Sequence, residues 1–133
     1  MSSSQEELAA WIKQELMSEE ADELNRNKER LKGLVKLTSD GSVIITRRGL
    51  TSRLEIGLYY VGLTYAKIAS LRPDDSAPNK ELTEKLGLPE GTVHPKIKEL
   101  RDEHYIEPTK DGTHRINPRR INDLLDEVEK ATK

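Results

Sequence analysis

Side chains suited to contact with a phosphate or a base edge are concentrated in the second half of the chain. They are Thr92, His94, Lys96, Lys98, Arg101, Lys110, His114 and Arg115. Ammonium and guanidinium groups neutralise phosphates, and a suitably placed cation can donate hydrogen bonds to guanine. The chemistry that the set indicates is non-covalent binding of a polyanion, although each lysine taken alone is more typical of an ordinary solvated surface.

The same inventory offers little for catalysis. His94, His104 and His114 are ten residues apart on separate predicted elements, and no His-Glu-x-x-His pair occurs. The absence of cysteine excludes disulfides, thiolate nucleophiles and cysteine-bound zinc or iron–sulfur clusters. No glycine-rich loop follows a predicted strand, and Asp74-Asp75 stands in a proline-bracketed loop, where a turn is a simpler interpretation than a metal site. We therefore expect no enzyme, no metal and no cofactor.

The net charge of −2 hides an uneven distribution. Residues 1–33 carry a net charge of −3 and residues 121–133 carry −2, whereas residues 34–120 carry +3. The middle of the chain is thus mildly cationic between two acidic ends, and this distribution matters more for binding than the total. We find neither a basic N-terminal region with an apolar run nor eighteen uncharged apolar residues in succession. We expect a cytoplasmic protein without membrane contact.

Two helices joined by a tight turn are predicted to position the first five of these side chains. Gly87 suits the left-handed position after a helix over residues 79–86. Pro89 can open the next helix, which we expect over residues 89–104. The residues expected to face inward from that helix are Val93, Ile97 and Leu100, at spacings of four and three.

Two β-hairpins and two further helices are predicted around this pair. Residues 34–46 and residues 105–117 each place an Asp-Gly turn between strand-like runs, which is typical of a hairpin. A long helix with one broad apolar face is expected over residues 51–71. A closing amphipathic helix follows Asn117-Pro118.

The first 33 residues are predicted to form a helical arm outside the compact body. A narrow apolar stripe at its start consists of Leu8, Trp11, Ile12 and Leu16. Residues 19–32 are dominated by charge and hold too few apolar side chains to pack on a domain, so we expect a solvated helix there. The stripe leaves two interpretations open, namely a plain helical extension or a helix that pairs with a second chain.

The order helix, helix, turn, helix, hairpin over residues 51–117 resembles that of the winged helix-turn-helix family. The matching residues are Asn79-Lys80-Glu81-Leu82-Thr83-Glu84-Lys85-Leu86-Gly87-Leu88 in the first helix and turn, then Thr92-Val93, Ile97, Leu100 and Tyr105-Ile106. We accordingly expect a mainly α fold with small β-hairpins. Its parts would be a helical N-terminal arm (1–33), an additional β-hairpin and basic turn (34–50), and the winged helix-turn-helix domain with a C-terminal helix (51–133).

This resemblance implies a double-stranded DNA-binding protein that acts in transcriptional regulation. In the family, the second helix of the pair enters the major groove and the hairpin, called the wing, contacts flanking phosphates. The eight residues named at the outset would then contact DNA, five from helix 89–104 and three from wing 105–117. A homodimer through the N- and C-terminal helices is a further expectation, because such proteins often bind two half-sites.

Other features favour a different use of the same fold, as a protein–protein adaptor in a larger complex. Pro95 stands in the middle of the predicted contact helix and lacks an amide hydrogen. The carboxylates of the same helix, which would repel phosphate if they faced DNA, are Glu90, Glu99, Asp102 and Glu103. Binding of RNA is a third alternative.

Overall fold

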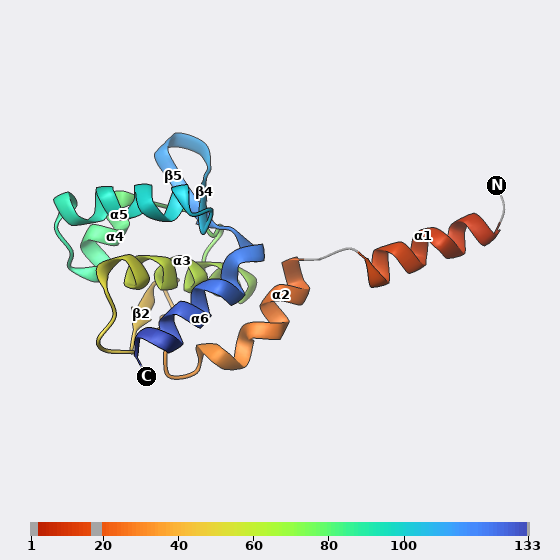
Figure 1. Ribbon diagram of the computed structural model, residues 1–133. Coiled ribbons are helices and arrows are strands. Elements are labelled where there is room, and N and C mark those ends of the chain that lie inside the picture. The colour runs from red at the N-terminus through yellow and green to blue at the C-terminus, as the bar shows by residue number, and fades with distance from the viewer. Residues whose placement is uncertain (1–2, 17–19, 133) are drawn as a thin grey trace.

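The computed structural model describes residues 3–16 and 20–132, so residues 1–2, 17–19 and 133 of the predicted segments lie outside it (Figure 1). Its α-helices are α1 (Ser3–Glu15), α2 (Glu20–Asn27), α3 (Ser52–Ile68), α4 (Asn79–Leu86), α5 (Glu90–Asp102) and α6 (Ile121–Ala131). Short 3-10 turns cover Lys28–Leu31, Lys110–Gly112 and Pro118–Arg120. The strands are β1 (Val35–Leu37), β2 (Val43–Ile45), β3 (Ala77–Pro78), β4 (Ile106–Pro108) and β5 (Thr113–Ile116). The mainly α fold class with small hairpins is confirmed.

Helix α3 lies at the centre of the body and is enclosed on every side (Figure 1). Thr51 caps it by accepting a hydrogen bond from the Leu54 amide at 3.3 Å. Every residue from Ile56 to Thr64 is buried, and a helix that is apolar all round must be surrounded by other elements. The expectation of one broad apolar face was wrong, since buried residues encircle α3 and Ile68, assigned to that face, is 62% exposed.

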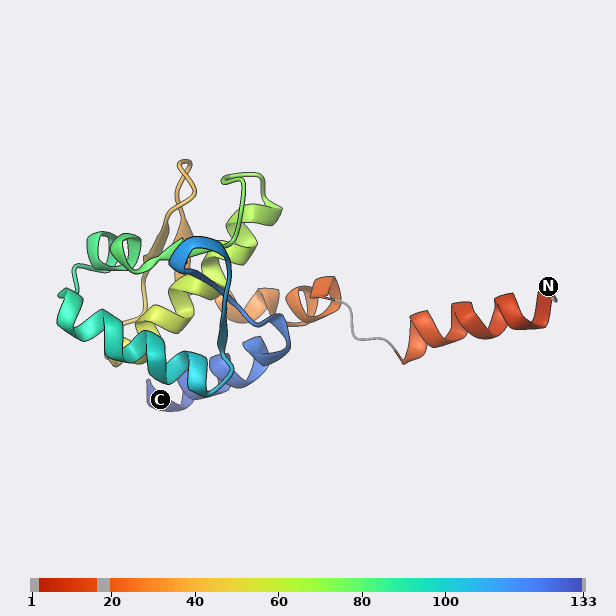
Figure 2. The same cartoon turned by 90° about the horizontal axis from the view of Figure 1, so that it is seen from above.

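The elements around α3 are α4, α5, α6, strand β5 and the β1–β2 hairpin (Figures 1 and 2). Two glycines of α3 set the closest approaches. A Cβ added at Gly57 would lie 3.0 Å from Leu124 Cδ2 on α6, and one added at Gly62 would lie 2.6 Å from Val43 Cγ1 on β2. A side chain at Gly62 would therefore displace the hairpin, and one at Gly57 would require Leu124 of α6 to shift by a few tenths of an ångström.

Both predicted hairpins are present as antiparallel pairs. Val35 of β1 lies opposite Ile45 of β2, and Ile106 of β4 lies opposite Ile116 of β5. The structure adds β3, which pairs with β5 and completes a three-stranded sheet in the order β3-β5-β4. The sequence predicts a loop for this segment, because two residues that include Pro78 are too few to show an alternating pattern.

The second half of the predicted arm packs on the body. Leu24 and Leu31 are buried, and the Tyr65 hydroxyl of α3 donates to the Leu24 carbonyl at 2.6 Å. Arg30 forms an ion pair with Asp126 of α6 at 2.6 Å. The expectation of a solvated helix here was wrong, because two leucines seven residues apart suffice for burial when another helix covers them.

The apolar face of α6 is used inside the molecule. Its residues Ile121, Leu124, Leu125 and Val128 are fully buried. The stripe that suggested a homodimer through the C-terminal helix therefore packs against the protein's own core. In contrast, every described side chain from residue 4 to residue 16 is exposed, and α1 stands apart from the body in Figure 1.

The close approach of α3 to β2 yields the first prediction. Gly62→Ala should lower the free energy of unfolding by about 1–3 kcal/mol, because the new methyl group has no room beside Val43. The measurement is urea denaturation. Gly91→Ala is the matched control: nothing lies within 4 Å of its added Cβ, so that helical site should gain roughly 0.5–1 kcal/mol. Equal effects at the two glycines would contradict this account of the packing.

Candidate nucleic-acid interface

Helices α4 and α5 form a rigid pair that presents one face of α5 to solvent. Gly87 ends α4 with φ +67°, the left-handed conformation that glycine adopts without strain. The buried positions that hold the pair on the core are Leu82 of α4 and Val93, Ile97 and Leu100 of α5. These inward residues of α5 confirm the spacing read from the sequence. The rest of its surface divides into two edges with different charge.

The first edge of α5 is exposed and cationic. His94, Lys98 and Arg101 follow one another at spacings of four and three, so they share one side of the helix. All three are exposed. Glu90 begins the same edge one turn earlier, next to Lys80 in a shallow pocket at the start of α4. This edge therefore carries two permanent positive charges, a histidine and one carboxylate.

The second edge of α5 is largely engaged in ion pairs. Thr92, Lys96, Glu99 and Glu103 lie along it at helical spacing. Lys96 pairs with Glu99 at 3.4 Å, and Glu103 pairs with Arg53 of α3 at 2.6 Å. The structure thus separates Thr92 and Lys96 from the other three predicted contact residues of this helix.

Pro95 lies between the two edges, on the outermost part of α5. The α-helix continues through it from Glu90 to Asp102. A proline cannot donate the hydrogen bond that would reach the carbonyl of Gly91, four residues earlier. Both positions are exposed, so water can satisfy that carbonyl. The helix therefore does not end at this proline.

The wing begins directly after α5 and is formed by β4 and β5. Asp111 and Gly112 both adopt positive φ, +57° and +74°, as expected for an Asp-Gly turn between two strands. Lys110 is exposed beside them at the tip. Of the three predicted wing contacts, Lys110 is the one that projects a charge from the end of the hairpin.

Arg115 is tied into the structure of the wing and presents no free cation. Its guanidinium forms ion pairs with Asp75 at 2.9 Å, with Glu107 at 3.0 Å and with Glu20 of α2 at 2.8 Å. Asp75 is itself 6% exposed. These hydrogen-bonded carboxylates raise the pKa of Arg115, Asp75 most strongly. Arg115 therefore joins three segments of the chain. Three carboxylates already neutralise its positive charge, so little of that charge is available to a phosphate.

His114 is buried within the wing sheet. It faces inward between two half-buried neighbours on β5 and is 8% exposed. Burial lowers the pKa of His114 below its ordinary value of 6.5, and the positive charge of Arg101 lowers it further. Its Nδ1 atom has no hydrogen-bond partner within the described structure. The neutral ring belongs to the packing of the wing, so the imidazole is not positioned on the outer surface.

A cluster around Tyr105 fixes the angle between α5, the wing and α6. The guanidinium groups of Arg53 and Arg120 lie 5.6 and 4.4 Å from the centre of its ring. The Tyr105 hydroxyl donates to Glu127 of α6, which Arg53 also binds at 3.0 Å. The hydrogen bond from Arg53 is the main cause of the lowered pKa of Glu127. Arg53 thus has a structural role, because it links the end of α5 to α6.

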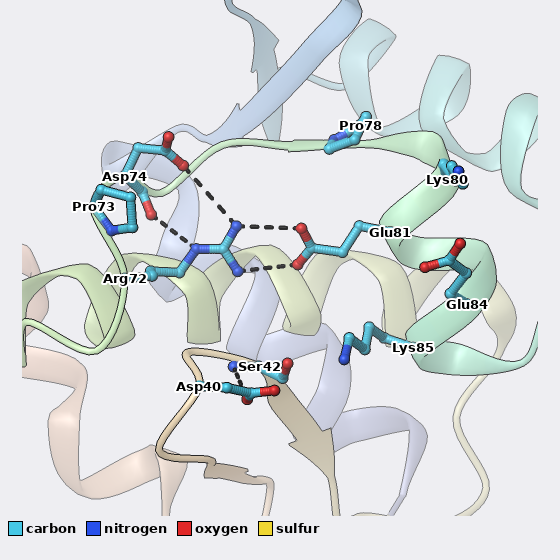
Figure 3. Close-up of a pocket in the computed structure, with 10 residues that line it drawn as sticks. All are labelled: Asp40, Ser42, Arg72, Pro73, Asp74, Pro78, Lys80, Glu81, Glu84 and Lys85. Carbon is cyan, nitrogen blue, oxygen red and sulfur yellow. Dashed lines mark hydrogen bonds and ion pairs between the residues drawn. The ribbon is translucent and has the colours of Figure 1, made fainter.

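A second cluster holds α4 in place beside a polar pocket (Figure 3). The Arg72 guanidinium donates two hydrogen bonds of 3.0 and 3.2 Å to the Glu81 carboxylate and one of 3.0 Å to the Gly41 carbonyl. The Tyr59 hydroxyl also donates to Glu81, at 2.7 Å. Figure 3 shows this ion pair between the β1–β2 turn and α4. No local sequence pattern predicts this cluster, because its members are far apart in the chain.

One family of known proteins matches the middle of the chain. Residues 68–107, which run from the end of α3 through α4 and α5 to β4, match the model of the winged helix-turn-helix DNA-binding family. This segment is a winged helix-turn-helix. The family suggested by the sequence is thereby confirmed over residues 68–107, which include α4 and α5.

No curated protein and no solved structure matches the chain. The residues that the structure describes contain no group of histidine and carboxylate side chains able to hold a metal ion. None of the described helices is both long and apolar enough to cross a membrane.

The burial of His114 yields a prediction for the pH dependence of stability. The pKa of His114 lies below 6.5 in the folded protein. As the pH falls below 6.5, the unfolded chain therefore binds a proton at His114 more readily than the folded protein does. This contribution to stability is present above pH 6.5 and is lost as the pH falls toward the lowered pKa. Thermal unfolding between pH 8 and 5 should show a steeper loss for the wild type than for His114→Gln. His94→Gln, at an exposed site, should keep the wild-type profile, and parallel profiles for His114→Gln would refute the assignment.

Proposed function

We propose that the protein binds double-stranded DNA through the first edge of α5, formed by His94, Lys98 and Arg101. The observation that carries this proposal is that the core holds α5 by its buried stripe, so the side chains of the neighbouring first edge face solvent together. An α-helix fits the width of the major groove, and three or four side chains on one side of it can reach base edges. Arg101 is suited to guanine because its guanidinium donates two parallel hydrogen bonds.

Phosphate contacts are proposed on either side of this edge. Lys110 at the tip of the wing can reach a flanking phosphate, as the wing does in this family. Lys80, exposed in the first turn of α4, lies at the other end of the edge beside Glu90. Thr92 and Lys96 occupy the second edge, so we assign them to the margin of the interface.

The positive charges on the first edge of α5 and on either side of it set the expected salt dependence of binding. Lys80, Lys98, Arg101 and Lys110 are four positive charges, whereas Glu90 opposes them at the start of α5. With about four phosphate contacts, affinity should fall steeply with salt, with a slope of roughly −3 to −4 in a double-logarithmic plot. We infer a role in transcriptional regulation in the cytoplasm, in which binding involves no chemical change in the DNA.

A charge reversal on α5 tests this proposal. Lys98→Glu combined with Arg101→Glu should abolish retention of a random duplex at low salt, because two attractive charges become repulsive. The thermal unfolding midpoint should stay nearly unchanged, since both side chains are exposed. Fluorescence anisotropy with a labelled duplex measures the affinity.

The matched control reverses two exposed cations on the hairpin and the turn after it. Lys36→Glu with Arg48→Glu changes the net charge by the same amount. That control should retain most of the affinity if the recognition edge lies on α5. Equal losses in both double variants would show that only the net charge matters, and undiminished binding by the α5 variant would remove α5 from the proposal.

A protein–protein adaptor is the second candidate, and the surface of α5 favours it in one respect. Its outermost ridge carries Pro95 and Asp102, and the second edge carries Glu99 and Glu103. An acidic, proline-bearing ridge suits a basic protein partner better than it suits phosphates. Wild-type protein that fails to bind any duplex at low salt, while remaining folded, would favour this alternative.

A further inference from the structure

The wing is held on its outer face through Arg115. Successive residues of β5 point to opposite faces of the wing sheet, so His114 faces the core and Arg115 faces outward. Two guanidinium nitrogens of Arg115 donate to one oxygen of the Asp75 carboxylate, at 2.9 and 3.1 Å. Asp75 belongs to the loop between α3 and β3, so this ion pair joins the wing to a segment outside it.

That loop is itself anchored on α4. The Arg72 guanidinium donates hydrogen bonds to the carbonyls of Asp74 and Ser76, at 3.0 and 3.1 Å. The same guanidinium forms the ion pair with Glu81 of α4 (Figure 3). Two arginines therefore make a continuous connection from α4 to the wing. We call this connection the arginine strut, which consists of Arg72, residues 74–76 and Arg115.

The two ends of the strut lie beside the two phosphate contacts proposed above. At the wing, Lys110 lines a shallow hollow together with Asp74 and Ser76. At the other end, Lys80 directly precedes Glu81 in the first turn of α4. Two contacts to a stiff duplex add most to the affinity when their separation is fixed before binding, because less conformational freedom is then lost. The strut connects the elements that set this separation.

We propose that Arg115 is a positioning residue for DNA binding, which keeps the wing tip in a fixed relation to α4 without touching DNA. The N-terminal arm takes part, because Glu20 of α2 binds Arg115 at 2.8 Å. Helix α2 is a firm support, since Leu24 is buried and its carbonyl accepts a hydrogen bond from Tyr65 of α3. This inference rests on the proposed DNA binding and adds the strut and α2 to the parts on which that binding depends.

Hydrogen exchange in the absence of DNA tests whether Arg115 fixes the wing. Arg115→Gln combined with Asp75→Asn removes the wing end of the strut, keeps the net charge and leaves neither member of the pair charged without the other, so the variant should fold. The Thr109 amide, bonded across the hairpin near its tip at 2.8 Å, should exchange about tenfold faster. The Asn117 amide, bonded at the base of the wing, should keep its rate. An unchanged rate at Thr109 would overturn the proposal.

The salt dependence of DNA affinity distinguishes positioning from a purely structural role. Lys110→Ala should make the slope of the double-logarithmic plot shallower by about one, because one phosphate contact is lost. The variant that lacks the Arg115–Asp75 pair should show the same change. Adding Lys110→Ala to that variant should change the slope little further, because both changes act on one contact. Additive changes would show that Lys110 acts independently of Arg115 and would overturn the proposal.

Glu20→Gln tests the contribution of the arm. Exchange at Thr109 should again become faster, but by less than in the Arg115 variant, because an ion pair with a half-exposed carboxylate is weak. Asp22→Asn is the matched control. It removes the same charge from an exposed position in the first turn of the same helix. Equal exchange rates at Thr109 in these two variants would overturn the role of the arm.

Failure of this inference can be distinguished from failure of the proposed function. If the wild type binds duplex DNA while the Arg115 and Asp75 double variant keeps both the wild-type exchange rate and the wild-type salt slope, this inference alone is overturned. If the wild type binds no duplex, the proposed function is overturned. Faster exchange at Thr109 in the double variant would still show that Arg115 fixes the wing.

Discussion

The complete burial of α3 is the constraint on which the rest of the structure depends. No residue between Ile56 and Thr64 reaches solvent, so the chain must supply a cover for every side of this helix. Helices α4 and α5 and strand β5 cover part of it, and the remaining sides are covered by α6 and the β1–β2 hairpin. Gly57 and Gly62 permit the last two contacts. The hairpin and α6 are therefore parts of the same core as the helix-turn-helix.

This enclosure also determines which surface of α5 is free. The core takes Val93, Ile97 and Leu100, which occupy one side of the helix, so the opposite side faces outward. Interactions around Tyr105 then hold the end of α5 and the start of the wing on α6. The cationic edge and the wing tip consequently keep a fixed relation to each other, which a binding surface for a stiff duplex requires.

Arginines and lysines play different parts in this protein. Arg30, Arg53, Arg72 and Arg115 each bind carboxylates from other elements and connect segments distant in sequence. The planar guanidinium suits this use, because it engages several oxygens at fixed angles. The positive charge available to a polyanion comes mainly from exposed lysines and Arg101, which explains how a chain with a net charge of −2 can present a cationic edge.

The sequence by itself determined the local elements: the helix pair around Gly87, the two Asp-Gly hairpins and the inward stripe of α5 all follow from spacing and turn chemistry. These patterns depend on neighbours within a few residues. Tertiary structure alone decided which side chains are free. Arg115 and His114 look like surface residues of a wing until Asp75 and the sheet enclose them. The packing of α2 and the pairing of β3 were likewise hidden, because they depend on partners remote in the chain that no local pattern specifies.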